Sequence, residues 1–164
     1  MKQLTLIRHA KSDWHSPSKT DFERPLNKRG EKAAPLMGRR LAARDCTPDC
    51  LLSSPADRAR QTAEIIAREI AYPQQRIEYA EAIYDAELET LIRVVQNLSD
   101  RNTHVILVGH NPGFSELGQW LAPEAPASLP TCGLLELDLP ISSWSEAIEG
   151  CAVLRLYDYP KKEF

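Results

Sequence analysis

The sequence predicts an α/β domain in which a mostly parallel β-sheet is sandwiched between layers of helices. Short apolar runs of strand length alternate along the chain with longer segments of helical periodicity. This alternation is typical of parallel sheets, because consecutive parallel strands need a crossover that is usually a helix. The length of 164 residues suits one domain, so residues 1–164 are expected to share a single core.

The first predicted strand and the first predicted helix are separated by a long polar segment. Gln3–Ile7 is a short, largely apolar run that suits a strand covered on both faces. Lys11–Arg29 contains prolines and many polar residues, which predicts a long loop lying over a functional site. Helical spacing predicts a helix over Lys28–Arg44 with Asn27 as its N-cap, and Pro35 is expected to bend or shorten its early turns.

The rest of the chain continues the alternation of strands and helices. Strands are predicted over residues 50–53, 76–79 and 104–108, and helices over residues 56–70, 88–98 and 114–121. Residues 133–139 and 152–157 add two more strands. The strand at 104–108 has the strongest signal in the chain, and the strand at 76–79 is weak.

Charge and composition limit what the protein binds. The formal net charge of −3 gives no general attraction to nucleic acid or to anionic membranes, so any anion site must be local. No apolar run reaches the roughly 20 residues that span a bilayer, and no signal-peptide pattern is present, so a cytoplasmic location is expected. The four cysteines lack CxxC spacing and are expected to be structural or neutral thiols: Cys46, Cys50, Cys132 and Cys151.

Three polar clusters follow three separate apolar runs. Arg8-His9 follows the first strand, Ser53–Pro55 leads to Arg58 after the second, and His110 follows the strand at 104–108. The carboxyl ends of parallel strands share one edge of a sheet, so these residues are expected to converge. Two arginines and two histidines in one site match the oxygens of a phosphoryl group, and Arg58 also sits where a helix begins.

The chemistry available to these residues is phosphoryl transfer to a histidine. His9 can attack phosphorus if one ring nitrogen is unprotonated while the other holds its proton against an acceptor, and the small Ala10 permits such close packing. His110 would donate a hydrogen bond to the phosphoryl oxygens. No metal ion or other cofactor is expected, because the arginines and histidines supply the positive charge.

At these residues the sequence resembles the histidine phosphatase superfamily, which includes cofactor-dependent phosphoglycerate mutases and acid phosphatases. The shared motifs are LIRHA (Leu6–Ala10), SSPADRARQTA (Ser53–Ala63) and VGHNP (Val108–Pro112), in the family's order. The resemblance implies that His9 is the phosphorylated nucleophile. It also implies a phosphate pocket of Arg8, Arg58 and His110, and a phosphoglycerate mutase-like, three-layer α/β/α sandwich.

Within that superfamily the chain resembles the SixA branch of protein phosphohistidine phosphatases. The resemblance rests on the RHAKSDW opening, on Asp21–Gly30 (DFERPLNKRG) and on the short length, which leaves no room for a large lid insertion. An open site suits a phosphohistidine carried on a signalling or phosphotransfer protein. His15 and Asp21 are expected among the substrate-binding residues, and the protein is expected to be a monomer.

The proton donor stays open at this stage. Mutases of the superfamily carry an asparagine and a glutamate where this chain offers His15 and an uncertain choice of acidic residues. The candidates for a general acid are Asp21, Glu81, Asp85 and Glu87, or none of them. Asp21 has an alternative role as an ion-pair partner of Arg24. A weak or absent acid would favour substrates with an N–P bond, because imidazole is a less basic leaving group than an alkoxide.

Three other hypotheses are compatible with the same residues. The first is hydrolysis of a small phosphate ester or nucleotide. The second is a phosphoprotein-binding module that does not turn phosphate over. The third is a zinc site formed by His9, His15 and His110.

Overall fold

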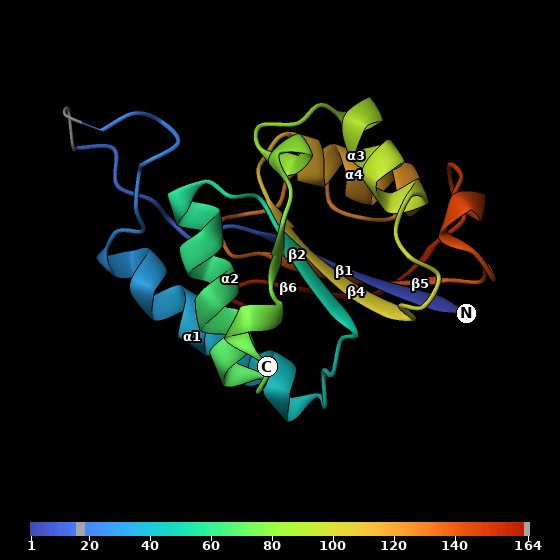
Figure 1. Cartoon of the computed structure of the whole chain (residues 1–164), viewed down its shortest axis with the longest axis horizontal. Coiled ribbons are helices and arrows are strands. Elements are labelled where there is room, and N and C mark those ends of the chain that lie inside the picture. Colours follow the sequence, from blue (N-terminus) through green and yellow to red (C-terminus); the bar gives the residue numbers. More distant parts are fainter. Residues whose placement is uncertain (16–18, 163–164) are drawn as a thin grey trace.

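The computed structural model describes residues 1–15 and 19–162, so the part of the predicted loop at 16–18 lies outside the described residues. Strands and helices alternate along the chain (Figure 1). The elements are β1 (Lys2–Arg8), α1 (Lys28–Ala43), β2 (Cys50–Ser53), α2 (Asp57–Glu69), β3 (Glu78–Tyr79), α3 (Leu88–Gln96), β4 (His104–Gly109), α4 (Gly113–Leu121), β5 (Leu134–Leu139) and β6 (Val153–Asp158). Short 3₁₀ helices occur at Gln74–Arg76, Glu81–Ile83 and Trp144–Glu146.

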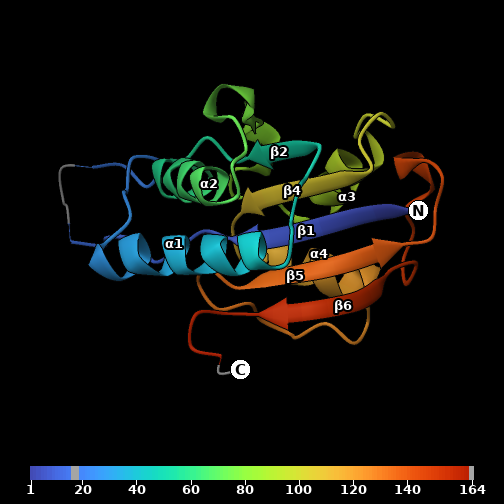
Figure 2. The same ribbon diagram turned by 90° about the horizontal axis from the view of Figure 1, so that it is seen from below.

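The strands form one six-stranded sheet in the order β3-β2-β4-β1-β5-β6. Figure 2 shows β2, β4, β1, β5 and β6 in this order across the sheet. The pairs β3–β2, β2–β4 and β4–β1 are parallel, whereas β5 runs antiparallel to both β1 and β6. The prediction of a mostly parallel sheet is therefore confirmed. The four parallel strands end at the same edge, and the functional residues predicted above follow three of them.

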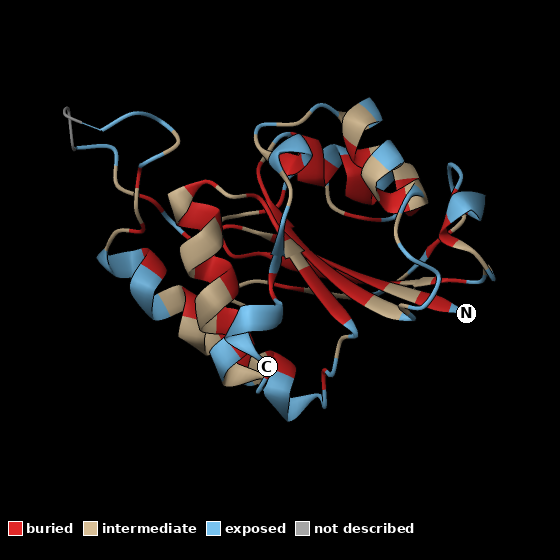
Figure 3. Cartoon of the chain, in the orientation of Figure 1, coloured by how far each residue is buried: buried red, intermediate tan, exposed pale blue. Residues whose placement is uncertain are grey.

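Helices cover both faces of the sheet, with α1 and α2 on one face and α3 and α4 on the other (Figure 1). Alternate residues of β1 pack into the two layers: Leu4 and Leu6 join the core beneath α3 and α4, whereas Ile7 joins the core beneath α1 and α2. The buried residues accordingly follow the strands and the inner faces of the helices (Figure 3). Burial on both faces explains why these strands are apolar at most positions.

Two predicted elements differ from the structure. The helix α1 begins at Lys28 and runs unbroken through Pro35, so its early turns are not shortened. Its buried apolar face and its cap, in which Asn27 accepts from the N–H of Gly30 at 2.9 Å, offset the hydrogen bond that proline removes. The weak strand at 76–79 is reduced to β3, because Gln74–Arg76 forms a 3₁₀ turn instead.

The long loop after β1 is closed at its base. The N–H of Asp13 donates to the carbonyl of Pro25 at 2.8 Å, and the N–H of Asn27 donates to the carbonyl of Lys11 at 3.0 Å. A Cβ at Gly30 would lie 2.2 Å from that Lys11 oxygen, so only glycine allows α1 to approach this closely.

The cysteines are free thiols, and no helix among the described residues is both long and apolar enough to cross a membrane. Burial raises the pKa of the Cys46 thiol to about 11 and that of Cys132 to about 12. The pKa of Cys50 is raised to about 12 by burial and by the nearby Glu78. These three thiols are therefore neutral at physiological pH, as predicted.

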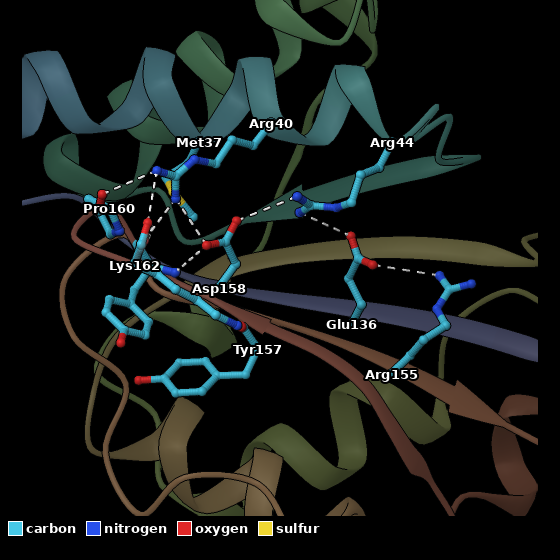
Figure 4. A network of polar contacts seen from close by, with 10 residues as sticks. Met37, Arg40, Arg44, Glu136, Arg155, Tyr157, Asp158, Pro160 and Lys162 are labelled. Atoms are coloured by element: carbon cyan, nitrogen blue, oxygen red, sulfur yellow. Dashed lines mark hydrogen bonds and ion pairs between the residues drawn. The ribbon is translucent and has the colours of Figure 1, made fainter. Parts of the chain in front are cut away.

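A buried carboxylate fastens the end of β6 to α1. Asp158 is fully buried and accepts from Arg40 at 3.0 Å and from Arg44 at 3.5 Å (Figure 4). The same Arg40 guanidinium donates to the carbonyls of Tyr159 at 2.9 Å and of Pro160 at 3.4 Å. The segment that follows β6 is thus held against the helix.

Arg40→Ala is expected to lower the free energy of unfolding by about 3 kcal/mol, because it leaves Asp158 as a buried and poorly compensated charge. The measurement is urea unfolding followed by circular dichroism. Arg155→Ala is the matched control from the same network, since Arg155 is half-exposed and lies 3.7 Å from Glu136. Its expected cost is below about 1 kcal/mol. Equal losses in the two variants would contradict the role of Arg40.

Candidate active site

Three strand ends bring the predicted catalytic residues together. In the parallel register Arg8 of β1 lies beside Gly109 of β4, and Ser53 of β2 lies beside Val108 of β4. The residues that follow these strands therefore meet at one cavity of about 450 Å³ at the carboxyl edge of the sheet. Its lining consists of Arg8, His9, Lys11, Ser12, Trp14, Asp21, Arg24, Arg58, Asp85, His110, Asn111 and Thr131.

The orientation of His9 is set by the backbone around it. Its N–H donates to the carbonyl of Gly109 at 2.9 Å, and its ring Nδ1 lies 2.7 Å from the carbonyl oxygen of Ala10. Because a carbonyl only accepts, Nδ1 carries the ring proton and Nε2 carries the lone pair. Nε2 in turn lies 3.4 Å from Nε of Arg58. This lone pair accepts from the Nε–H of Arg58, so it lies on the side of the ring that faces the arginine.

Thr62 ties the end of β1 to the first turns of α2. Its hydroxyl oxygen accepts from the N–H of Ala10 at 3.0 Å, and its hydroxyl donates to the carbonyl of Arg58 at 2.8 Å. Thr62 is fully buried. The backbone that holds the proton of His9 is thereby fixed relative to the helix that carries Arg58.

Both histidines of the cavity are neutral near pH 7. Burial lowers the pKa of His9 to about 3, although the hydrogen bond to the Ala10 carbonyl opposes the shift. Burial and the charge of Arg58 lower the pKa of His110 to about 4. A neutral His9 with a fixed tautomer can act as a nucleophile without first losing a proton.

The ring resonances of His9 and His110 are expected to stay at their neutral positions from pH 8 down to pH 5. The reason is that both pKa values lie well below the ordinary value of 6.5. Heteronuclear NMR, with the two rings assigned from single-histidine variants, measures this directly. A titration step of His9 between pH 6 and 7 would contradict a neutral nucleophile.

The same shifts affect stability. Unfolded histidines take up a proton near pH 6.5, whereas the folded ones do so only near pH 3 and 4. The folded state is therefore expected to lose stability as the pH falls below about 6.5.

Asp21 brings the long loop over the cavity. Its carboxylate accepts from Nη2 of Arg58 at 3.2 Å, from Nη2 of Arg24 at 3.0 Å and from the hydroxyl of Tyr84 at 2.5 Å. Nη1 of Arg58 also donates to the backbone carbonyl of Asp21 at 2.7 Å. Arg24 stacks its guanidinium 3.4 Å from the ring centre of the exposed Trp14. The loop thus lies over the site, as predicted.

The environment of Asp21 keeps its carboxyl group ionised. Burial would raise its pKa, but the hydrogen bond from Tyr84 and the charge of Arg58 outweigh this effect and lower the pKa to about 2. Asp21 therefore holds no proton to donate at neutral pH. Of the other acidic candidates, Asp85 lines the cavity but is exposed, and Glu81 and Glu87 are exposed and do not line it.

Within the described residues, His110 and Arg8 each carry one buried side-chain nitrogen without a hydrogen-bond partner. Nε2 of His110 lies 2.7 Å from Oγ of Ser54, whose oxygen accepts from the N–H of Ala56 at 3.3 Å. The serine hydroxyl can donate to Nε2, and in that tautomer the proton of His110 lies on Nδ1. That Nδ1 and Nε of Arg8 are buried and have no partner in the described part of the chain. A bound anion would satisfy both donors, each of which otherwise costs about 1–3 kcal/mol.

His15 lies apart from this cluster. It is exposed, its backbone N–H donates to Asp13 at 2.8 Å, and it is absent from the cavity lining. Its part in substrate binding stays a prediction. Within residues 1–15 and 19–162, no group of three or more His, Cys, Asp or Glu side chains could hold a metal ion, and His9, His15 and His110 form no such group.

Three residues of the site were given no role in the sequence analysis. Ser54 contacts His110, Thr62 fixes the backbone beside His9, and Tyr84 binds Asp21. Ser54 and Thr62 lie inside the SSPADRARQTA motif, which was a usable signal. Tyr84 follows a 3₁₀ turn near a weak strand, and nothing in its local pattern indicated the site.

Comparison with known proteins agrees with this geometry. The family model of the histidine phosphatase superfamily (branch 1) matches residues 4–89, just over half of the chain, including Arg8, His9 and Arg58. The chain belongs to the histidine phosphatase superfamily. Membership indicates phosphatase activity, and it confirms the resemblance seen in the sequence.

Relatives and solved structures extend the match over most of the chain. An uncharacterized Mycobacterium tuberculosis protein (strain H37Rv) is 33% identical over 94% of this chain and 100% of its own length. The candidate phosphohistidine phosphatase SixA from Agrobacterium tumefaciens is 30% identical, with a TM-score of 0.81 over 97% of this chain and 98% of its own.

A protein histidine phosphatase SixA solved with tungstate shares the fold at 22% identity, with a TM-score of 0.81 over 96% of this chain and 97% of its own. These matches confirm a SixA-like histidine phosphatase with the α/β/α architecture and without a large lid insertion.

Proposed function

We propose that this histidine phosphatase removes phosphoryl groups from phosphohistidine on a signalling or phosphotransfer protein, in the cytoplasm. The observation that carries the proposal is the pairing of a neutral, oriented His9 with a cavity whose ionised Asp21 holds no proton. Such a site supplies a nucleophile and an anion pocket, while the carboxylate of Asp21 at the cavity has no proton to give to a leaving group. The likeness to the SixA structure of Agrobacterium tumefaciens supports the same substrate class.

The reaction would proceed in two displacements. Nε2 of His9 forms a bond to phosphorus while the N–P bond of the substrate breaks, and the departing imidazole leaves as a neutral ring because its remote nitrogen takes a proton from water, whose hydroxide returns to the solvent. A water molecule then attacks the phosphorus on His9, which releases inorganic phosphate and restores the free imidazole. In both steps Arg8, Arg58 and the Nδ1–H of His110 would contact the phosphoryl oxygens.

The missing acid is the argument for an N–P substrate. An ester oxygen leaves as an alkoxide and needs a proton in the transition state, a contribution worth about 10²- to 10⁴-fold in rate. Asp21 is held as a carboxylate by Arg58, Arg24 and Tyr84, and Asp85 is exposed at the edge of the cavity. Phosphohistidine does not depend on such a donor.

Phosphate release from a phosphohistidine protein is expected to exceed release from a phosphoserine peptide or an alkyl phosphate by about 100-fold in kcat/KM. Asp21→Asn is the informative variant, since it keeps the shape of the side chain but removes the charge. Its turnover of phosphohistidine is expected to stay within about tenfold of the wild type. A small phosphate ester hydrolysed as fast as the phosphohistidine protein would overturn the proposal. A loss of about 10³-fold in Asp21→Asn would return Asp21 to the role of general acid.

A further inference from the structure

A second hollow adjoins the catalytic cavity and is unused by the mechanism above. It is a groove of about 550 Å³ between the outer face of α1, the segment before β5 and the segment after β6. Lys11 and Thr131 line both the groove and the catalytic cavity, so the two hollows are adjacent. A chain whose phosphorylated residue enters the cavity would lie beside this groove.

The floor of the groove is apolar. Ala33 and Leu36 face it from α1, while Pro130 and Pro160 contribute from the other two segments. The segment after β6 forms one wall of the groove. This wall is preformed, because Arg40 of α1 donates to backbone carbonyls in that segment (Figure 4). A preformed apolar floor favours a partner that inserts apolar side chains, since little ordering has to accompany binding.

The rim of the groove is cationic. Lys11, Arg29, Lys32 and Lys161 line it and are exposed, and no acidic side chain joins them in the lining. In the described part of the chain none of these four side chains forms an ion pair or a hydrogen bond, whereas Arg40, Arg58 and Arg60 are all paired. The concentration of unpaired positive charge stands out on a chain whose net charge is −3. Negative charge on a partner would complement it.

We propose that this groove docks an acidic, amphipathic segment of the phosphorylated carrier protein, next to its phosphohistidine. The inference rests on the proposed function and adds to it a recognition rule: apolar side chains of the segment contact Leu36 and its neighbours, and Asp or Glu side chains contact the cationic rim. A small phosphate ester would occupy the catalytic cavity and leave the groove unused. The groove therefore provides selectivity for a protein substrate without adding a catalytic group.

The test is a charge reversal that avoids the catalytic cavity. In Arg29→Glu/Lys32→Glu both changes lie on exposed positions in the first half of α1, where negative charge is compatible with the helix dipole. Arg93→Glu/Arg101→Glu is the matched control, with the same change of net charge at exposed positions that line neither hollow. Leu36→Gln tests the apolar floor separately.

Two substrates separate this inference from the proposed function. One is a carrier protein whose phosphohistidine is flanked by Asp and Glu, and the other is free phosphohistidine. For the carrier, Arg29→Glu/Lys32→Glu is expected to lower kcat/KM by about 10- to 100-fold, mainly through KM and less at high salt. Leu36→Gln is expected to lower kcat/KM for the carrier at least severalfold. Free phosphohistidine should be hydrolysed at the wild-type rate by all variants, and Arg93→Glu/Arg101→Glu should match the wild type on both substrates.

Each other outcome has a definite meaning. If the wild type hydrolyses the carrier but the groove variant and the control behave alike, the docking inference is overturned while the proposed function stands. Equal losses on free phosphohistidine and on the carrier would also overturn docking, because the groove would then act on the phosphoryl group itself. If the wild type does not hydrolyse the carrier at all, the proposed function fails first. On a carrier with Asn and Gln in place of its flanking acids, the wild type and Arg29→Glu/Lys32→Glu should have the same kcat/KM.

Discussion

His9→Ala is expected to lower kcat for phosphate release by about 10⁴-fold or more, the largest effect of any single change in this chain. The substitution removes Nε2, the atom that would bond to phosphorus, while Arg8, Arg58 and His110 remain to hold the anion. Binding of substrate should therefore survive the loss of turnover. The measurement pairs steady-state phosphate release with trapping of the phosphorylated enzyme. Label should be retained by the wild type in alkali, released in acid, and absent from the variant.

His104→Gln is the matched control for the removal of a histidine. His104 begins β4, at the opposite edge of the sheet from the cavity, and its ring Nε2 contacts the hydroxyl of Thr5 at 2.9 Å. Glutamine can keep that hydrogen bond, so activity should stay near the wild-type level. Turnover by His9→Ala at a tenth of the wild-type rate, or labelling of that variant, would rule out His9 as the phosphoryl acceptor.

Arg58→Ala is expected to lower kcat/KM by about 10²- to 10³-fold. This is the range found when one preorganised hydrogen-bond donor is removed from an enzyme active site. Arg58 is almost fully buried, and its guanidinium lies between Nε2 of His9 and the carboxylate of Asp21. Its planar fork can bind two phosphoryl oxygens at once, which an ammonium group cannot do. Arg58→Lys is therefore expected to recover only part of the loss.

Arg60→Ala controls for the removal of an arginine from the same helix. Arg60 is on the outer side of α2, where it pairs with the half-exposed Glu64 at 2.9 Å and with Asp57 at 3.5 Å. Its loss should leave kcat/KM within about twofold and change stability by less than about 1 kcal/mol. If Arg58→Ala and Arg60→Ala lowered kcat/KM equally, the assignment of Arg58 to the phosphate pocket would be wrong. Unfolding curves of both variants separate a catalytic loss from an unfolded fraction.

The predicted fold follows from local patterns that the tertiary structure preserves. Runs such as Gln3–Ile7 and the strand at 104–108 are buried on both faces, so their apolar character is strong enough to detect in the sequence. Weak elements were less predictable: the strand expected at 76–79 shrank to the two residues of β3, which are both exposed and gain little from burial. The helix α1 continues through Pro35 because its inner face packs against the rest of the protein, and this packing cannot be predicted from helical periodicity.

The convergence of the candidate catalytic residues was predictable for a related reason. His9, Arg58 and His110 each follow an apolar strand, and parallel strands bring their carboxyl ends together whatever their separation in the chain. The contacts that orient them were not predictable. Ser54 reaches His110 across 56 positions and Tyr84 reaches Asp21 across 63, and such pairs depend on the register of the sheet and the path of the loop.

The sequence by itself determined the alternation of strands and helices, the motif residues at the strand ends and hence the candidate nucleophile. The tertiary structure decided the protonation states, because burial of His9 lowers its pKa to about 3 and the contacts of Asp21 lower its pKa to about 2. It also decided which cations stay unpaired, since the groove beside the cavity is assembled from segments near residues 11, 33, 130 and 160. Ionisation and surface charge depend on neighbours in space, and only the folded chain brings those neighbours together.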